Sequence, residues 1–475
     1  MPQPSLFLLA AAELTAEVPL VLPVAPGGVP PEYAVAAKAA GFTAVPGQVL
    51  TLWGVGRTAT ILVGLDPADP EAAGAQAASS LPRAPRLAID GRGLPRAMAT
   101  AIAVGAALRS WRFPTNRFAE DPEAMVIGRI DLVVEDARKE GKHWRRALAV
   151  LEGVGFARDL VAEPSNTLTP ALFVKRLRPL TDLGLKLDVI PAEDFAAKGL
   201  RLIAAVGGGS VNPPCLVVMR WKGKLDLPPL AFVGKGITFD TGGISIKPAD
   251  RMWDMRGDMA GAAACVGAMV TLARRESPTP AIAVLALAEN MIGATSYRPG
   301  DILRSHAGRT IEIIDTDAEG RLVLSDALSY AVATYTPRAI VDFATLTHAV
   351  SVALGHERAG LYDNDETLAA HLGAAGEVVG ERLWRMPIGA SHREALNSEV
   401  ADLRQCNTGR LIPDASQAAA LMREFVGDTP WAHIDIGGTE QRDEGDARYS
   451  AGPTGFGVRL LDQLVAARYE DPEHP

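Results

Sequence analysis

The sequence predicts an α/β protein built from a small N-terminal α/β domain and a larger C-terminal domain with a mixed central sheet flanked by helices. Short apolar runs typical of buried strands alternate along the chain with alanine-rich and amphipathic segments typical of helices. The chain has 475 residues, of which 48% are hydrophobic and 22% are charged, so it is long enough to bury two cores. We expect the N-terminal domain over residues 1–140, a connecting helix over 141–162 and the C-terminal domain over 163–475.

Two strand-like runs and one helix candidate define the predicted N-terminal domain. Residues 59–64 and 130–134 are mainly apolar, and an alanine-rich segment over 94–108 lies between them. This alternation predicts a small α/β unit. The following segment, 140–161, carries charged residues first and apolar residues at helical spacing later, which predicts the connecting helix.

Four further apolar runs, separated by helix-like segments, predict the sheet of the C-terminal domain. They cover residues 216–219, 230–233, 281–288 and 339–343. Such runs are typical of strands that are covered on both faces, so we expect a mixed sheet wrapped by helices. A strand-like segment over 431–435 contains His433, which we interpret as a core histidine with Asp435 as its candidate partner.

Two carboxylates and a guanidinium alternate within residues 315–326, where Asp317, Glu319 and Arg321 stand at every second position beside a glycine. On an extended segment, this period of two sends all three side chains to one side. The two anions then repel each other unless a cation neutralises them, and Arg321 supplies one charge only. The alternative is a solvated charged loop before a helix that begins near Ser325, which is the commoner explanation of an isolated pattern of this kind.

A second polar cluster, upstream in the sequence, favours a bound cation over a solvated charged loop. Residues 230–233 indicate a buried strand, and the glycine-rich loop that follows holds Lys235, Asp240 and Lys247 where open α/β sheets bind ligands. Asp258 stands directly before the small-residue run 259–265, which predicts a closely packed helix. Taken alone, Asp258 is more simply explained as an N-cap.

Together, the two clusters resemble the metal-binding signature of the leucine aminopeptidase family of dinuclear metallo-aminopeptidases, also called cytosol aminopeptidases. The resemblance extends from residues 163–170 through both clusters and 344–347 to 431–435 and 454–457. It implies that the metal ligands are Lys235, Asp240, Asp258, Asp317 and Glu319, and that the catalytic pair is Lys247 and Arg321. It also implies that the C-terminal domain is catalytic and that the substrate contacts Met255, Thr345, Leu346 and His348.

The charges of the implied ligands agree with this resemblance. The four carboxylates bring four negative charges, which equals the charge of two divalent ions. Carboxylate oxygens with one amine suit Mg²⁺, Mn²⁺, Co²⁺ or Zn²⁺ and do not select firmly among them. Lys235 must be neutral to coordinate, which an adjacent dication in a dry pocket favours.

The activity that the resemblance implies is hydrolysis of the N-terminal residue from short peptides with a free N-terminus. Two divalent metals would hold the attacking water or hydroxide, and one of them would bind the α-amine. Lys247 would stabilise the oxyanion, and Arg321 would hold a bicarbonate as general base. Neither cluster offers a spare His or Glu for that task. The resemblance also implies a homohexamer.

Composition argues against several other classes of protein. The net charge of −9 argues against nonspecific binding to nucleic acid and to an anionic membrane surface. The apolar stretches fall well short of the roughly 18 residues that a membrane span needs. Three scattered cysteines indicate a reducing compartment, and the apolar run over 6–12 lacks the basic segment of a signal peptide. We therefore expect a cytoplasmic protein.

Two alternative functions remain open. A DNA-binding or regulatory protein on the same fold would need a basic surface, for which the N-terminal region offers scattered arginines at positions 83, 86, 92, 96, 109 and 112. The second alternative is a peptidase specialised for dipeptides such as Cys-Gly. A panel of peptide substrates and a DNA-binding assay would separate these functions.

Three departures from the family pattern concern specificity rather than metal binding. Asp315 stands where asparagine is usual, His348 stands where glycine is usual, and residues 411–417 replace a more glycine-rich loop. In the family fold, the position of His348 borders the pocket for the first side chain, so we expect a narrower or more polar pocket. The sequence leaves open the preferred N-terminal residue and the native metals.

Overall fold

The computed structural model describes residues 3–81, 84–113, 127–139, 141–407, 409, 412–446 and 448–471. The chain forms two compact units. The N-terminal unit consists of residues 1–155 with 442–452, and the C-terminal unit consists of residues 156–441 with 453–475. Both units contain sheets and helices, which confirms the predicted α/β class. The domain boundaries at 140 and 162 stay a prediction.

The N-terminal unit is built on a six-stranded sheet in the order β1-β6-β5-β2-β4-β3. The strands are β1 (Ser5–Ala10), β2 (Leu20–Val24), β3 (Val49–Trp53), β4 (Ala59–Gly64), β5 (Arg86–Asp90) and β6 (Arg129–Val134). All neighbouring strands are parallel except β3 and β4. The helical segments are η1 (Ala11–Glu13), η2 (Pro31–Tyr33), α1 (Ala34–Ala39), α2 (Pro70–Ser80) and α3 (Arg96–Ser110). The predictions for 59–64, 94–108 and 130–134 are confirmed as β4, α3 and β6.

The C-terminal unit contains an eight-stranded mixed sheet in the order β15-β14-β17-β13-β9-β10-β8-β7. The strands are β7 (Lys186–Pro191), β8 (Cys215–Trp221), β9 (Leu230–Asp240), β10 (Ala281–Asn290), β13 (Ala339–Ala344), β14 (Ala359–Asp363), β15 (Leu383–Arg385) and β17 (Trp431–Asp435). At its centre, β17, β13, β9 and β10 run parallel to one another. The apolar runs that predicted this sheet are therefore confirmed as β8, β9, β10 and β13.

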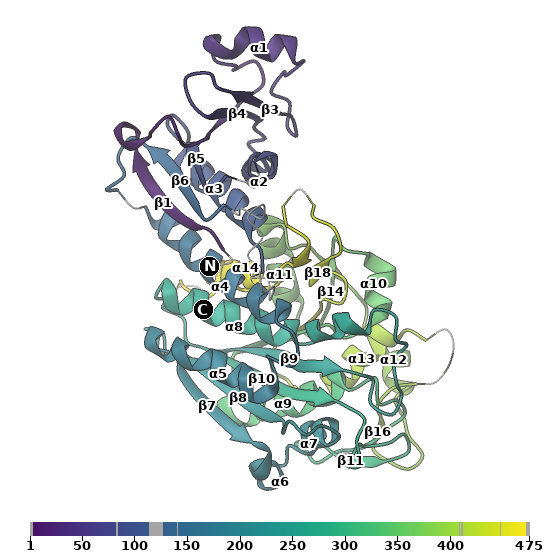
Figure 1. Cartoon of the computed structure of the whole chain (residues 1–475). Coiled ribbons are helices and arrows are strands. Elements are labelled where there is room, and N and C mark those ends of the chain that lie inside the picture. The colour runs from purple at the N-terminus through teal and green to yellow at the C-terminus, as the bar shows by residue number, and fades with distance from the viewer. Residues whose placement is uncertain are drawn as a thin grey trace. The chain divides into compact units, whose positions relative to one another are not determined.

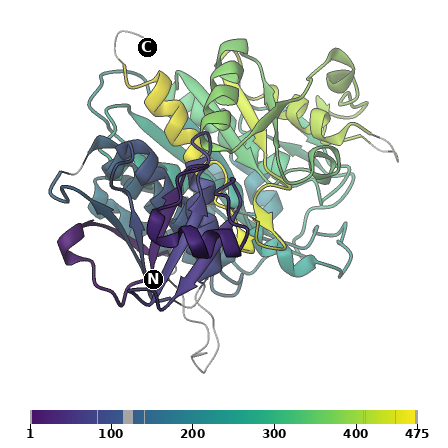
Figure 2. The same ribbon diagram turned by 90° about the horizontal axis from the view of Figure 1, so that it is seen from above.

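Helices cover both faces of this sheet (Figure 1). The chain includes α4 (Lys142–Ala162), α5 (Pro170–Leu177), η3 (Arg178–Leu183), η4 (Ala192–Asp194), α6 (Phe195–Lys198), α7 (Arg201–Gly207), η5 (Met252–Gly257), α8 (Ala260–Arg274), α9 (Gly320–Tyr335), α10 (His348–Leu354), α11 (Glu366–Val379), α12 (Ala390–Glu394), α13 (Asp414–Arg423) and α14 (Val458–Arg468). Helix α14, yellow in Figure 2, packs against α8 and α11. Helix α9 packs against β9, α7 and α13 on the other face.

Short strands complete the set: β11 (Ile302–Arg304), β12 (Thr310–Glu312) and β16 (Leu403–Arg404) form a small sheet, and β18 (Gln441–Arg442) and β19 (Gly452–Pro453) follow later in the chain. The helix predicted over 140–161 is confirmed as α4. Within the described ranges, none of the helices combines the length and apolar character that crossing a bilayer requires.

Close backbone contact fixes the beginning of α8 on the central sheet. A Cβ atom at Gly261 would lie 2.1 Å from the carbonyl oxygen of Phe343 in β13, and one at Gly234 in β9 would lie 2.5 Å from Cα of Ala262. Only glycine allows such an approach without a shift of the backbone. The small-residue run after Asp258 therefore docks α8 tightly onto β9 and β13.

Candidate metal centre

Five side chains with metal-binding chemistry meet at the carboxyl end of the parallel strands. Lys235 and Asp240 belong to β9, and Asp240 is the last residue of that strand, so the prediction that the loop begins directly after residue 233 is wrong. Asp258 lies between η5 and α8, and Asp317 and Glu319 precede α9. Open α/β sheets bind their ligands at this end of the strands.

Lys235 forms the inner half of the cluster. Its Nζ atom lies 2.8 Å from Oδ1 of Asp258 and 2.7 Å from Oε1 of Glu319. The three residues are 3%, 7% and 1% exposed, respectively. Two carboxylates thus share one ammonium group in an interior that is nearly closed to water.

Lys247 forms the outer half. Its Nζ atom lies 2.9 Å from Oδ2 of Asp240 and 2.5 Å from Oδ1 of Asp317. Carboxylate oxygens of Asp240, Asp317 and Glu319 all lie within 4.8 Å of one another, so the two halves form one cluster. The side chains of Lys247 and Asp317 are 21% and 33% exposed, which makes this the open side of the site.

The ionisation of the cluster shows a shortage of positive charge. Burial raises the pKa of the Asp258 carboxyl well above its usual value. Burial, together with the neighbouring Asp240, raises the pKa of Asp317 to about 7. Burial alone lowers the pKa of Lys235, but the adjacent carboxylates outweigh this effect, and the net direction is upward. Before a metal binds, both lysine ammonium groups therefore act as counter-ions to the carboxylates, and Lys235 would coordinate a metal only as the neutral amine.

The donor set fits divalent cations. Oδ2 of Asp258 is buried and has no hydrogen-bond partner among the described residues, which is costly for a carboxylate oxygen unless a cation approaches it. Four ionised carboxylates against two lysine ammonium groups leave the cluster with an excess of two negative charges. Hard oxygen donors with one amine suit Mg²⁺, Mn²⁺, Co²⁺ or Zn²⁺.

The segment that carries Asp317 and Glu319 contains a turn, so the extended geometry that would send Asp317, Glu319 and Arg321 to one side is not formed. Glu319 has the helical backbone angles φ −73° and ψ −33°, and α9 begins at Gly320 rather than near Ser325. The early start is possible because Gly320 lacks a side chain: a Cβ atom there would lie 2.8 Å from Cδ and Cε of Lys235. Arg321, the second residue of α9, forms an ion pair with Asp414 at the start of α13.

Comparison with known proteins identifies the family. The family model described as "Cytosol aminopeptidase family, catalytic domain" matches residues 155–462. The probable cytosol aminopeptidase of Chelativorans sp. (strain BNC1) is 46% identical over 372 residues, which are 78% of this chain and 75% of that protein. The chain belongs to the cytosol aminopeptidase family. It is therefore a metal-dependent aminopeptidase, a hydrolase that acts on peptides.

Other relatives agree with this assignment over most of the chain. The probable cytosol aminopeptidase of Rhizobium etli (strain CIAT 652) is 44% identical over 409 residues, covering 84% of this chain and 82% of that protein. Among solved structures, the bottromycin maturation enzyme BotP in complex with Mn has a TM-score of 0.85 at 36% identity, covering 95% of this chain and 99% of that chain. The cytosol aminopeptidase of Coxiella burnetii has a TM-score of 0.84 at 28% identity, with coverages of 97% and 99%.

The aminopeptidase cluster is held by a layer of residues that sequence reasoning missed. Nδ2 of Asn290 donates to Oδ1 of Asp240 at 2.8 Å and to the carbonyl oxygen of Thr316 at 2.9 Å. The hydroxyl of Thr316 in turn donates to the carbonyl oxygen of Gly242 at 2.7 Å. Gly242 has a φ of +86°, which lets the chain turn directly after Asp240. Asn290 ends β10, next to β9, so a polar residue that ends a buried strand is the signal that could have identified it.

The loop after β13 contacts the cluster through Thr345. Its carbonyl oxygen accepts from Nζ of Lys235 at 2.9 Å, and its hydroxyl donates to Oδ1 of Asp258 at 2.8 Å. The buried Asp435 holds this loop, since its carboxylate accepts from the backbone N–H of Leu346 at 3.1 Å and from the hydroxyl of Thr347 at 2.7 Å. The loop thus joins the end of β17 to two residues of the cluster.

The four residues predicted to contact substrate differ in how closely they approach the cluster. The carbonyl oxygen of Met255 accepts from the backbone N–H of Asp258 at 3.3 Å. Leu346 is half-buried, and its Cδ1 would lie 2.9 Å from a Cβ atom on Gly320. His348 is exposed at the first position of α10. The structure therefore brings Met255, Thr345 and Leu346 to the cluster and places His348 on the adjoining surface.

The assignment of Asp435 as the partner of His433 is wrong. Nδ1 of His433 lies 2.6 Å from Oδ1 of Asp342, and the same carboxylate accepts from Nε1 of Trp431 at 2.6 Å. Residues 342 and 433 face each other across the parallel strands β13 and β17. Cross-strand register, which sequence alone does not give, selects Asp342. His433 itself is fully buried, as predicted.

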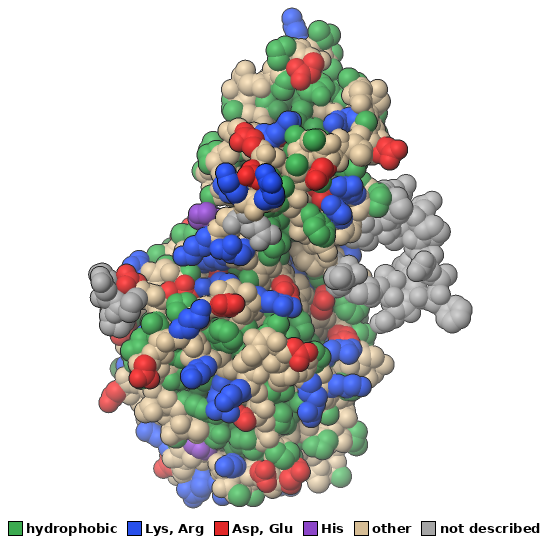
Figure 3. All heavy atoms as spheres, turned by 90° about the vertical axis from the view of Figure 1, so that its left-hand side faces the viewer, with side chains coloured by type: hydrophobic (Ala, Val, Ile, Leu, Met, Phe, Trp, Pro, Cys, Tyr) green, Lys and Arg blue, Asp and Glu red, His purple; other side chains and the backbone are tan. Residues whose placement is uncertain are grey.

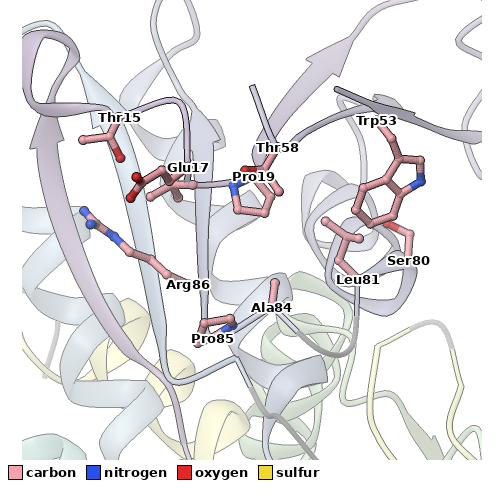
Figure 4. Close-up of a pocket in the computed structure, with 11 residues that line it drawn as sticks. Thr15, Glu17, Pro19, Trp53, Thr58, Ser80, Leu81, Ala84, Pro85 and Arg86 are labelled. Atoms are coloured by element: carbon pink, nitrogen blue, oxygen red, sulfur yellow. The ribbon is translucent and has the colours of Figure 1, made fainter. Parts of the chain in front are cut away.

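A separate pocket of about 620 Å³ belongs to the N-terminal unit. Figure 4 shows Trp53 and Leu81 at one side of it and Glu17 near Arg86 at the other. Its lining is mainly apolar. Within the described part of the chain, the group of three carboxylates that could hold a metal lies in the C-terminal unit. We therefore assign the metal-dependent chemistry to the C-terminal unit.

Proposed function

We propose that this chain removes the N-terminal residue from short peptides by using two divalent ions held by Lys235, Asp240, Asp258, Asp317 and Glu319. The observation that carries the proposal is the buried cluster of four carboxylates with one orphaned oxygen on Asp258. Two ions bound there supply a nucleophilic water at neutral pH and a Lewis acid for the substrate. Mn²⁺, Zn²⁺, Mg²⁺ and Co²⁺ are the candidate ions, and the similar BotP structure, which was solved in complex with Mn, supports Mn²⁺.

Lys247 stabilises the oxyanion in this proposal. Burial opposes its charge, but Asp240 and Asp317 outweigh burial and raise the pKa of Lys247, so the ammonium persists at neutral pH. Its side chain reaches the open side of the cluster, where a peptide carbonyl can approach. With divalent cations bound to Asp240 and Asp317, Nζ of Lys247 would be available to donate to the developing negative charge.

Arg321 holds an oxyanion, for which bicarbonate is our candidate, and this anion serves as general base. The guanidinium is 2% exposed, and Nε and Nη1 have no hydrogen-bond partner within the described ranges. A buried guanidinium with free N–H groups favours a planar oxyanion.

Substrate recognition combines the free α-amine with a pocket for the first side chain. Met255, Thr345 and Leu346 lie beside the cluster and are the proposed walls of that pocket. His348, three residues after Thr345, adds a polar group at the rim. A hydrolysis panel of aminoacyl reporters and dipeptides, including Cys-Gly, tests both the activity and its specificity. If the protein hydrolysed Cys-Gly and no other substrate of the panel, it would be a dipeptide-specialised peptidase rather than a broadly specific aminopeptidase. If it hydrolysed no substrate with any of the four metals, the proposal would be refuted.

Assembly as a cytoplasmic homohexamer is part of the proposal. Several large apolar side chains of the C-terminal unit are exposed, among them Trp253 at 60%, Trp384 at 54% and Val352 at 73%. Exposed apolar groups of this size are typical of surfaces that other chains cover. A closed assembly around the active sites would admit short peptides and exclude folded proteins.

Binding to nucleic acid receives little support from the N-terminal unit. Arg86 pairs with the buried Asp131, Arg92 pairs with Asp90, and Arg112 donates to backbone carbonyls. Arg83 lies outside the described residues. On the face drawn in Figure 3, basic and acidic side chains are interspersed rather than gathered by sign. Such a surface gives phosphate groups no continuous basic track to follow.

A further inference from the structure

Asp414 forms an ion pair with the guanidinium of Arg321, the group that we propose holds the general base. Nη2 of Arg321 donates to Oδ1 of Asp414 at 2.8 Å. The side chain of Arg321 is 3% exposed, whereas that of Asp414 is 30% exposed. The buried guanidinium of Arg321 is thus paired with a carboxylate of the same chain that is partly exposed to solvent.

The guanidinium of Arg321 also has two nitrogens that Asp414 does not pair with. Nε and Nη1 of Arg321 are buried and lack a hydrogen-bond partner among the residues that the structure describes. Buried N–H donors without partners are costly, so an oxyanion that reached them would be bound. Asp414 would then lie beside that oxyanion on the same cation, and two anions so close repel each other.

Asp414 belongs to the segment in which the sequence departs from the glycine-rich family pattern. It is the first residue of α13, directly after Pro413. A carboxylate at the first turn of a helix is favourable in itself, but that role does not require contact with Arg321. A role at the start of α13 therefore does not explain why Asp414 forms an ion pair with Arg321, a buried residue of α9.

We propose that Asp414 controls the affinity of Arg321 for bicarbonate. By neutralising the guanidinium, it weakens the binding of an external oxyanion and holds Arg321 in position without one. The inference rests on the proposed function, because it assumes that Arg321 serves the general base. Asp414 is a positioning residue in this account, since it acts through Arg321 and not on the substrate.

The test compares bicarbonate binding by the metal-loaded wild type, Asp414→Asn and Asp414→Glu. Bicarbonate is titrated at constant ionic strength while the melting temperature of the protein is recorded. We expect Asp414→Asn to bind bicarbonate more tightly by about tenfold or more, because a like charge next to the anion is removed. Asp414→Glu should restore weak binding, and Arg321→Ala should bind none.

Glu424 offers a matched control. It directly follows α13 and pairs with Arg309 and Arg393, so Glu424→Gln removes an ion pair of the same region without touching Arg321. We expect the bicarbonate affinity of Glu424→Gln to equal that of the wild type. If bicarbonate affinity changed by the same factor in Glu424→Gln and Asp414→Asn, the loss of any negative charge in this region would explain the effect. That result would overturn the proposal.

Turnover supplies a second readout. In buffer freed of carbon dioxide, both proteins should slow, and the wild type should need a higher concentration of added bicarbonate than Asp414→Asn to recover half of its rate. Equal bicarbonate affinities and equal bicarbonate dependence in the two proteins would refute the role of Asp414. If the wild type hydrolyses no peptide at any bicarbonate concentration, the proposed function fails, and the binding comparison still decides whether Asp414 controls the anion site.

Discussion

Lys247 and Lys235 make similar ion pairs but differ in their access to the substrate. Each ammonium bridges two carboxylates, yet the side chain of Lys235 is 4% exposed and that of Lys247 is 21% exposed. Lys235 also donates to the carbonyl oxygen of Thr345, which fixes it on the inner side. The difference in exposure suits one lysine to metal coordination and the other to substrate contact.

Substitution of the two lysines tests this division. Lys247→Ala should keep its metal content while kcat falls by about 10²–10³, the usual effect of losing an oxyanion donor. Lys235→Ala should lose metal affinity and therefore activity. Metal content by elemental analysis and kcat on one aminoacyl reporter are the measurements. Loss of metal from Lys247→Ala with retention in Lys235→Ala would show that the roles are reversed.

His348 provides a second prediction at this scale. If its imidazole narrows the rim of the first pocket, His348→Gly should raise kcat/KM for Leu and Phe substrates relative to Ala by about tenfold, which corresponds to about 1.4 kcal/mol. The control is Val352→Ala, because Val352 is exposed on the same helix α10 one turn further on. An unchanged Leu-to-Ala ratio in His348→Gly would place His348 outside the specificity pocket.

Individual residues of the site could be predicted where their chemistry is unusual in the sequence. Lysines and acids in a glycine-rich segment after an apolar run stand out, so Lys235, Asp240 and Lys247 were identified, although β9 extends through Lys235 to Asp240. Asn290 and Asp435 were not, because a single polar residue at the end of a strand is common. Only the pairing of β9 with β10 and of β13 with β17 brings them to the cluster.

At the level of elements, the loop after β13 links the sheet to the proposed metal ligands. Asp435 at the end of β17 is buried, and it accepts hydrogen bonds from Leu346, Thr347 and Gly437. Thr345, in the same loop, contacts both Lys235 and Asp258. Residues that orient metal ligands in this way commonly contribute to metal affinity.

We predict that Asp435→Asn lowers metal affinity by about 10–100-fold, because the loop that positions Lys235 and Asp258 loses an acceptor. Asp342→Asn is the matched control: Asp342 is equally buried on the neighbouring strand, but its partners are Trp431 and His433 in the core. Both variants should unfold more easily than the wild type. Calorimetric titration with Mn²⁺ should show weaker binding in Asp435→Asn only, and equal affinities in the two variants would contradict the role of the loop.

The elements that sequence predicted well share a strong apolar signal. Strands β9, β10 and β13 are buried almost throughout and were recognised from their composition. Strand β7 lies at the sheet edge, and its residues are exposed or half-buried, so it lacks that signal. The start of α9 was placed too late because Glu319 and Arg321 have the polarity of a loop, while their burial is set by tertiary contacts.

For the whole molecule, the proposed homohexamer makes a prediction of size. Six chains of 50.0 kDa give an assembly of about 300 kDa, in which exposed apolar side chains such as Trp253 and Trp384 are covered. Light scattering at micromolar concentration should give this mass. A fully active species of the mass of one chain would exclude the hexamer as a requirement for activity.

The central claim is that a cluster of four carboxylates and Lys235 binds two ions that activity requires. Protein freed of metal with a chelator should be inactive, and titration with Mn²⁺ should restore hydrolysis of an aminoacyl reporter in step with the binding of two ions per chain. Glu319→Ala, titrated in parallel, should bind less metal and stay slow. Full turnover by the metal-free protein, or saturation of activity at one ion per chain, would contradict the account.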